Sequence, residues 1–182
     1  MRERANAFRG VWVCGMVLAA WCLTSGGAGA EVIDRVLAVV GGVVITQSDA
    51  TAAVELGLVT IRGTGDPIES ALSLLIERQL MLVEVDRYVP PEPAADSVDR
   101  RLQSIRARFS SAAQFDAMLA RSGFDQQRLR QTIRDELRIG AYLDQRFGVP
   151  PLTTERRAAL LAEWVSGLRR RADINYLYVP RR

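Results

Sequence analysis

Apolar residues recur every three or four positions along most of the chain, which is the spacing of helices that pack on one side. The stretch 96–109 is a clear example, because Val98, Leu102 and Ile105 fall on one face together with Phe109. In residues 68–88 the apolar positions cover well over half of the helix circumference, which predicts a central helix with several neighbours. Helices are expected over about 47–57, 66–88, 96–109, 111–123, 125–147 and 153–172.

Short β-branched runs lie at the two ends of this helical region. Residues 34–40 and 43–45 flank Gly41-Gly42, a pair typical of a tight hairpin turn. Residues 173–179 have the composition of a strand, and a lone strand needs a partner for its backbone groups. We therefore predict a mainly α fold in which the N-terminal hairpin (about 34–46) and the C-terminal strand (about 174–178) share one small sheet.

Capping residues mark several of the predicted helix starts. Thr46 precedes a helix that carries Asp49 at its third position, and Asp66-Pro67 combines a cap with a proline at the first helical position. Ser111 followed by Gln114 predicts a reciprocal capping box, and Asp125 can cap the next long helix. Gly123 is expected to end the short helix, and Pro90, Pro91 and Pro93 predict a stiff connector after the central helix.

The first thirty residues have the pattern of a secretory signal peptide. Three arginines precede an apolar run over 11–23, and the small residues Ala28-Gly29-Ala30 follow. Cleavage is expected between Ala30 and Glu31, leaving residues 31–182 as a single domain without a stable membrane anchor. A retained anchor helix stays open as an alternative, because Trp12 and Trp21 suit a membrane interface. Lipid attachment at Cys22 is disfavoured, since Trp21 is not small.

Composition excludes much of enzyme chemistry. The chain has no histidine, which removes imidazole acids and bases, histidine-activated nucleophiles and histidine-ligated zinc. Both cysteines, Cys14 and Cys22, lie before position 31. No nucleotide-binding motif or suitably spaced carboxylate pair is evident, so we expect no catalytic residues, no cofactor and no metal. All 24 basic residues are arginine, but residues 31–182 hold 21 of them against 20 acidic residues, which does not favour nucleic-acid binding.

Several segments resemble SurA-type periplasmic chaperones. The opening Asp34-Arg35-Val36-Leu37-Ala38-Val39-Val40, with Val44-Ile45-Thr46 and Ser48-Asp49, looks like the start of that family's N-terminal domain. The segment 75–84 is similar to its long helix, and 115–147 to its helix-turn-helix close. Trp164, Leu168, Arg169, Ala172 and Ile174 resemble its C-terminal helix and strand. The resemblance implies that residues 153–179 complete one core with the N-terminal part.

The chain also departs from this family. Parvulin-type prolyl isomerase domains usually lie between the helical part and the C-terminal helix, whereas here only 148–152 separate them, so isomerase activity is not expected. Gly41-Gly42 stands where the family often has a polar residue. The resemblance implies an ATP-independent periplasmic chaperone that binds unfolded or extended exported polypeptides, such as outer-membrane proteins. The alternative is an exported docking module for one dedicated partner, using the terminal sheet edge or Arg169-Arg170-Arg171.

The candidate peptide-contacting residues are aromatic or methionine positions, and core packing is the alternative reading for each of them. They are Tyr88, Phe109, Phe115, Met118 and Tyr142. Glu136 falls inside an apolar stripe, where pairing with an arginine is the simplest expectation. Arg130, Arg134 and Arg138 are expected to form a solvent-exposed row.

Overall fold

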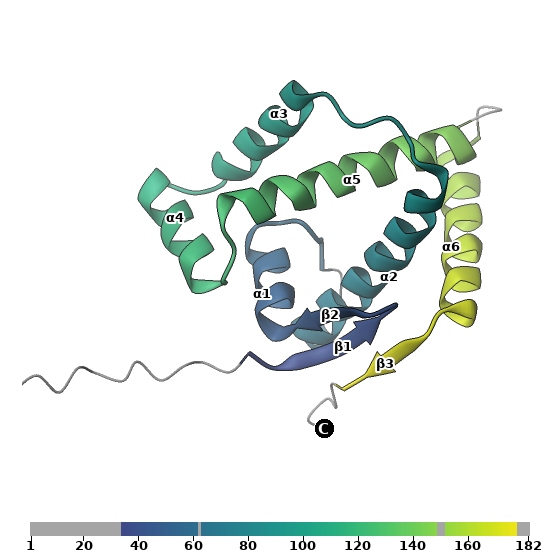
Figure 1. Ribbon diagram of the computed structural model, residues 1–182, viewed down its shortest axis with the longest axis horizontal. Coiled ribbons are helices and arrows are strands. Elements are labelled where there is room, and N and C mark those ends of the chain that lie inside the picture. The colour runs from purple at the N-terminus through teal and green to yellow at the C-terminus, as the bar shows by residue number, and fades with distance from the viewer. Residues whose placement is uncertain (1–33, 62, 149–151, 178–182) are drawn as a thin grey trace, which may run out of the picture. The chain divides into compact units, whose positions relative to one another are not determined.

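A computed structural model of the chain describes residues 34–61, 63–148 and 152–177. The fold is mainly helical with a small antiparallel sheet, as the sequence predicts (Figure 1). The expected cleavage position between Ala30 and Glu31 lies outside the described residues. The elements in chain order are β1 (Val36–Val40), β2 (Val43–Thr46), α1 (Gln47–Glu55), α2 (Pro67–Tyr88), α3 (Ala95–Arg106), α4 (Ala112–Arg121), α5 (Gln126–Phe147), α6 (Thr154–Arg171) and β3 (Ile174–Tyr176).

The two glycines of the hairpin turn adopt the backbone conformation that made them a turn signal. Gly41 has φ 55° and Gly42 has φ 83°, so both central positions are left-handed, as in a type I′ turn. β1 and β2 pair antiparallel, with Val40 opposite Val43 directly beside the turn. This turn fixes the register of the hairpin.

The two ends of the described chain meet in the sheet, as predicted. The strand order is β2-β1-β3, and Val40 pairs with Ile174 while Ala38 pairs with Tyr176. The amide of Leu177 donates to the carbonyl of Leu37 at 2.9 Å, which extends the pairing beyond β3. The strand itself is shorter than the predicted 174–178, and position 178 lies outside the described residues.

Most of the predicted helix caps are present. Thr46 and Asp49 form the reciprocal capping box of α1, and the side chains of Asp66 and Asp125 accept amide hydrogen bonds at the starts of α2 and α5. The box at α4 is only half formed. Ser111 accepts from the amide of Gln114, but the Gln114 side chain accepts from Ser110, one residue before the cap. The last turn of the preceding segment brings Ser110 within reach.

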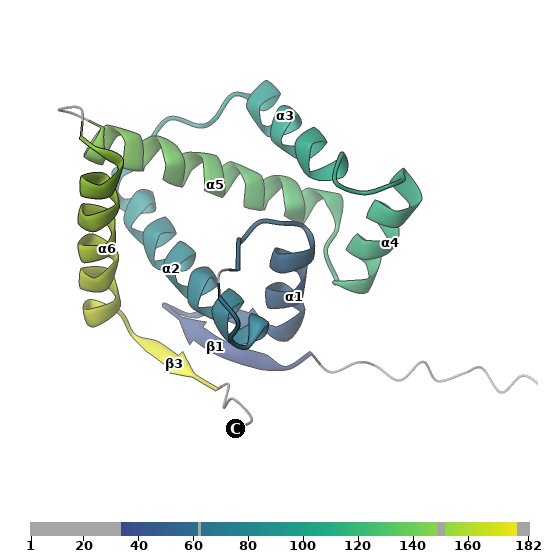
Figure 2. The same ribbon diagram turned by 180° about the vertical axis from the view of Figure 1, so that it is seen from behind.

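The central position predicted for α2 is confirmed, since it contacts α1, α5, α6 and both strands of the hairpin. Figure 2 shows from behind how α6 runs beside α2 before the chain turns into β3. Three buried clusters form the core. The sheet cluster includes Leu37, Val40, Ile45, Ile76 and Leu168; the helical cluster includes Leu102, Ile105, Phe115, Leu129 and Ile133; a smaller cluster joins Val85, Ile139 and Tyr142.

Two predictions about α3 and α5 need correction. α3 ends at Arg106, so Phe109 lies in the following turn instead of on the helix. The row Arg130, Arg134 and Arg138 is not uniformly exposed, because only 14% of the Arg138 side chain is accessible. Arg138 pairs with Asp86 on α2 at 2.8 Å, an interaction between helices that the pattern along α5 alone does not reveal.

Candidate functional site

Three of the five candidate peptide-contacting residues belong to the core. Phe115 and Met118 are each 2% exposed and Tyr142 is 5% exposed, so their side chains are not available to a ligand in this conformation. Phe109 is half-buried and packs against the Phe115 ring at 5.4 Å. Tyr88 is 60% exposed at the end of α2. Core packing, the alternative reading, therefore applies to Phe115, Met118 and Tyr142.

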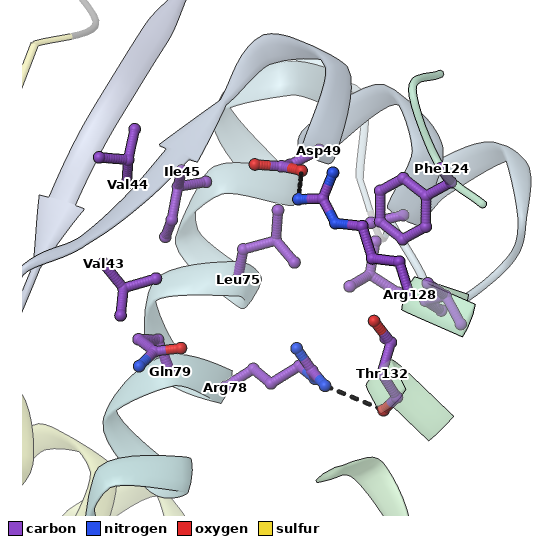
Figure 3. Close-up of a pocket in the computed structure, with 13 residues that line it drawn as sticks. Val43, Val44, Ile45, Asp49, Leu75, Arg78, Gln79, Phe124, Arg128 and Thr132 are labelled. Carbon is purple, nitrogen blue, oxygen red and sulfur yellow. Dashed lines mark hydrogen bonds and ion pairs between the residues drawn. The ribbon is translucent and has the colours of Figure 1, made fainter. Parts of the chain in front are cut away.

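A concave site lies elsewhere, where β2, α1, α2 and α5 meet (Figure 3). This β2 pocket has a volume of about 130 Å³. Much of its lining is aliphatic, from β2, the end of α1 and α2, and Phe124 adds an aromatic ring. Its lining residues are Val43, Val44, Ile45, Asp49, Ala53, Leu58, Val59, Leu75, Arg78, Gln79, Phe124, Arg128 and Thr132.

A second hollow, the α2 groove, adjoins the β2 pocket along α2 and has a volume of about 670 Å³. Leu58, Val59 and Arg78 line both hollows, so the two adjoin. The groove combines aliphatic side chains with hydroxyl groups and carboxylates. Its remaining lining residues are Thr60, Ser70, Ser73, Leu74, Glu77, Met81, Glu136 and Ile139. It is an open groove and not an enclosed cavity, and apolar walls with a few polar groups are typical of ligand-binding surfaces.

Arg78 is the charged residue shared by the two hollows. Its Nη2 donates to the backbone carbonyl of Thr132 on α5 at 2.9 Å and lies 3.6 Å from the Asp135 carboxylate. Burial lowers the pKa of Arg78, and the carboxylates of Asp135 and Glu136 oppose that shift. Burial likewise raises the pKa of Asp135, against the effect of Arg78. Because an arginine pKa starts far above neutral, Arg78 carries a positive charge at the pocket wall.

The second arginine of the β2 pocket is held in place from two sides. The Nη2 of Arg128 donates to Asp49 at 2.7 Å, and its guanidinium stacks over the Phe124 ring at 4.3 Å from the centroid. Asp49 also caps α1 through Thr46. Because the Asp49 carboxylate both caps α1 and accepts from Arg128, it holds Arg128 at the start of α1. The Asp49–Arg128 pair is the polar part of the pocket lining, and Leu75 belongs to its aliphatic part (Figure 3).

Ion pairs also shape the walls of the α2 groove. Glu136 pairs with Arg101 at 2.8 Å, as expected for a carboxylate in an apolar stripe. Arg169 reaches from α6 to Ser73 and lies 3.2 Å from Glu77. Within the Arg169-Arg170-Arg171 cluster, Arg169 is thus engaged with α2, whereas Arg170 and Arg171 are exposed.

Sequence reasoning did not single out Arg78 or Arg128 as site residues. The available signal was weak: Arg78 lies in the middle of a helix with a wide apolar surface, but its direct neighbours are Glu77 and Gln79. A charged residue in that setting indicates a partner or a cavity. Arg128 gave no comparable signal, because it stands in the polar first turn of α5.

Comparison with protein-family models and with curated proteins finds no match for the chain. Within the described ranges, no group of carboxylates or other ligating side chains is arranged to hold a metal ion. Among the described helices, none combines the length and apolar character that crossing a bilayer requires. The site consists of an apolar hollow with two arginines, which suits binding.

Proposed function

We propose that this protein is an ATP-independent periplasmic chaperone that binds unfolded exported polypeptides, outer-membrane proteins among them. The proposal joins two sequence features, the signal-like segment ending at Ala30 and the resemblance to SurA-type chaperones. It includes removal of the leader before Glu31. Prolyl isomerase activity is not part of it, because the few residues between α5 and α6 are too short for an isomerase domain.

The observation that carries the proposal is the pair of adjoining hollows along α2. Together the β2 pocket and the α2 groove offer aliphatic walls over several turns of one helix, with Met81 as an adaptable contact. Polar groups are spaced along the rim, among them Ser70, Ser73 and Gln79. An unfolded segment can place apolar side chains in such hollows while its backbone stays near polar partners, which gives weak, broad binding.

Without a nucleotide cycle, a chaperone of this kind releases its clients because each contact is weak. Burying one aliphatic side chain contributes about 1.5–3 kcal/mol, much of which offsets the ordering of a flexible client. Client exchange then depends on rebinding and handover to a more stable folded state. The moderate size of the two hollows agrees with such low-affinity capture.

A dedicated docking module is the second candidate, and the exposed apolar residues of the sheet favour it. Val43 and Val44 are 43% and 49% exposed, and Tyr176 and Leu177 are 54% and 49% exposed. A fixed partner that covers these residues would give a stable complex with one protein instead of transient binding to many. Of the arginine cluster at the end of α6, only Arg170 and Arg171 are exposed to such a partner, since Arg169 is engaged with Ser73 and Glu77.

The test is suppression of aggregation without ATP. The full chain, produced with its own leader and purified after export, is added near stoichiometry to an outer-membrane β-barrel protein diluted from urea. Reduced light scattering supports the chaperone. Leu74→Ser, in the α2 groove, should weaken the effect about fivefold or more. Val83→Ser, on the same helix outside both hollows and 37% exposed, should leave it unchanged.

Two results would overturn the proposal. Equal loss in both serine variants, with unchanged thermal unfolding, would show that the groove is not the binding surface. No suppression by the parent protein, together with a stoichiometric complex with one partner on gel filtration, would favour the docking module.

A further inference from the structure

The outer edge of β2 has the geometry of a strand acceptor. In the order β2-β1-β3, β2 is an edge strand. The type I′ turn places Val40 and Val43 as the first hydrogen-bonded pair, so the next pair, Val39 with Val44, is non-hydrogen-bonded. The amide and carbonyl of Val44 therefore point away from β1. Within the described part of the chain, no residue outside the sheet hydrogen-bonds to them.

This edge is short, with four residues and an irregularity in its pairing with β1, but it carries no charged residue and no proline. Proteins usually protect edges with charged residues, proline or a covering element. β2 reads Val-Val-Ile-Thr, and its first two valines are 43% and 49% exposed. All three apolar residues of β2 line the β2 pocket. An extended segment paired with Val44 would therefore have a pocket beside it for one of its side chains.

The charge of the pocket indicates what the segment carries. The ionic residues in the lining are two arginines and one aspartate, Arg78, Arg128 and Asp49, and Asp49 is already paired with Arg128. Nη2 of Arg78 donates to the Thr132 carbonyl and lies 3.6 Å from the Asp135 carboxylate, so one end of the guanidinium is already paired, but no described residue accepts from its Nε or Nη1. Neither Nε nor Nη1 of Arg78 is among the buried atoms that lack a hydrogen-bond partner, so a ligand can reach both from solvent. A carboxylate is the ligand that a guanidinium fork with free N–H groups binds best.

We propose that an extended client segment adds to β2 as a further strand, with an aliphatic side chain in the β2 pocket and an acidic side chain on Arg78. The inference deepens the proposed function and rests on it, since it specifies the client as an acidic-aliphatic strand. Backbone pairing supplies affinity that does not depend on sequence, and the pocket with Arg78 supplies selectivity. The α2 groove then receives the continuation of the same client.

The test uses a fluorescein-labelled peptide, Thr-Val-Asp-Leu-Thr-Val-Thr, and fluorescence anisotropy with the full chain purified after export. A second peptide carries N-methyl groups on two neighbouring residues, which blocks both of its edges while adding apolar surface. A third replaces Asp by Asn. We expect the methylated and the Asn peptides each to bind about tenfold more weakly, from lost backbone and charge-assisted hydrogen bonds respectively.

Variants of the protein test the same backbone hydrogen bonds at Val44. Val44→Pro removes the outward-pointing amide while leaving the Val40–Val43 pair intact, so proline is tolerated at this edge. It should bind the parent peptide about fivefold more weakly or worse, whereas Val44→Thr, which keeps the amide and the branched shape but makes this lining position more polar, should lose clearly less. If Val44→Pro unfolds, the methylated peptide against the wild-type protein decides the question.

The outcomes separate the strand proposal from the chaperone proposal. Equal binding of methylated and parent peptides overturns strand addition, and the chaperone role survives if aggregation is still suppressed. Selective peptide binding without suppression retains the strand site and removes the chaperone role. A dimer that dissociates in Val44→Pro but not in Val44→Thr, without peptide binding, would assign the edge to a second copy and overturn the client proposal.

Discussion

Replacing Leu168 by alanine tests whether α6 completes the core with the N-terminal elements. Leu168 is 7% exposed and lies in the sheet cluster with Leu37, Val40 and Ile76. The substitution removes carbon atoms worth about 0.8 kcal/mol each, or about 2.4 kcal/mol, and the cavity left behind raises the cost to about 3 kcal/mol. That is a large fraction of the roughly 5–15 kcal/mol that stabilises an average domain.

The assay is urea denaturation followed by circular dichroism, with the free energy of unfolding extrapolated to water. Leu161→Ala is the matched control, because it makes the same chemical change in the same helix at a half-buried position outside the three clusters. We expect Leu161→Ala to cost less than about 1 kcal/mol. If Leu168→Ala costs no more than Leu161→Ala, α6 is not part of the cooperative core and the argument for closure of the fold is wrong.

Three further substitutions test local features. Ser48 donates both its amide and its hydroxyl to Asp34; burial alone would raise the pKa of Asp34, but the hydrogen bonds from Ser48 and Thr46 lower it. A carboxyl group whose pKa is lower in the folded than in the unfolded state stabilises the fold above the unfolded-state pKa, and this stability is lost as pH falls through the folded-state pKa. Asp34→Asn removes the titrating group. The free energy of unfolding, measured by urea titration, should therefore fall less steeply below about pH 4 than in the parent protein. Gly42→Ala should cost about 1 kcal/mol in thermal unfolding, because Gly42 has φ 83°; an unchanged melting temperature would contradict the turn assignment. Asp125→Ala should cost about 1 kcal/mol through the lost cap of α5, while Asp125→Ser should be nearly neutral, and equal losses would show that capping is not the cause.

The sequence predicted those features that depend on residues close together in the chain. The cap at Asp66, the turn at Gly41-Gly42 and the apolar circumference of α2 are local signals, and the structure has each of them. Pairing of the two chain ends was also predictable, because a single strand needs a partner. The fold class followed from these signals together.

The site was much less predictable, because it depends on which residues from separate elements come together. Phe115 and Met118 were predicted as candidate peptide-contacting residues from their residue type alone, yet α3 and α5 bury them in the helical cluster. Arg138 was expected to be exposed, yet its side chain is largely covered and pairs with Asp86 on α2. The β2 pocket needs contributions from β2, α2 and α5, whose distances no periodicity along one segment can specify.

The pairing of β1 with β3 has a consequence for the order in which this fold can form. β1 is among the earliest parts of the described chain to be synthesised, while its partner comes after all six described helices. Loop closure over such a separation is slow, because its entropic cost comes before the contacts that reward it. The sheet therefore stays incomplete until the segment around Tyr176 is available for folding, and an intermediate that lacks it would leave one edge of β1 unpaired and prone to association.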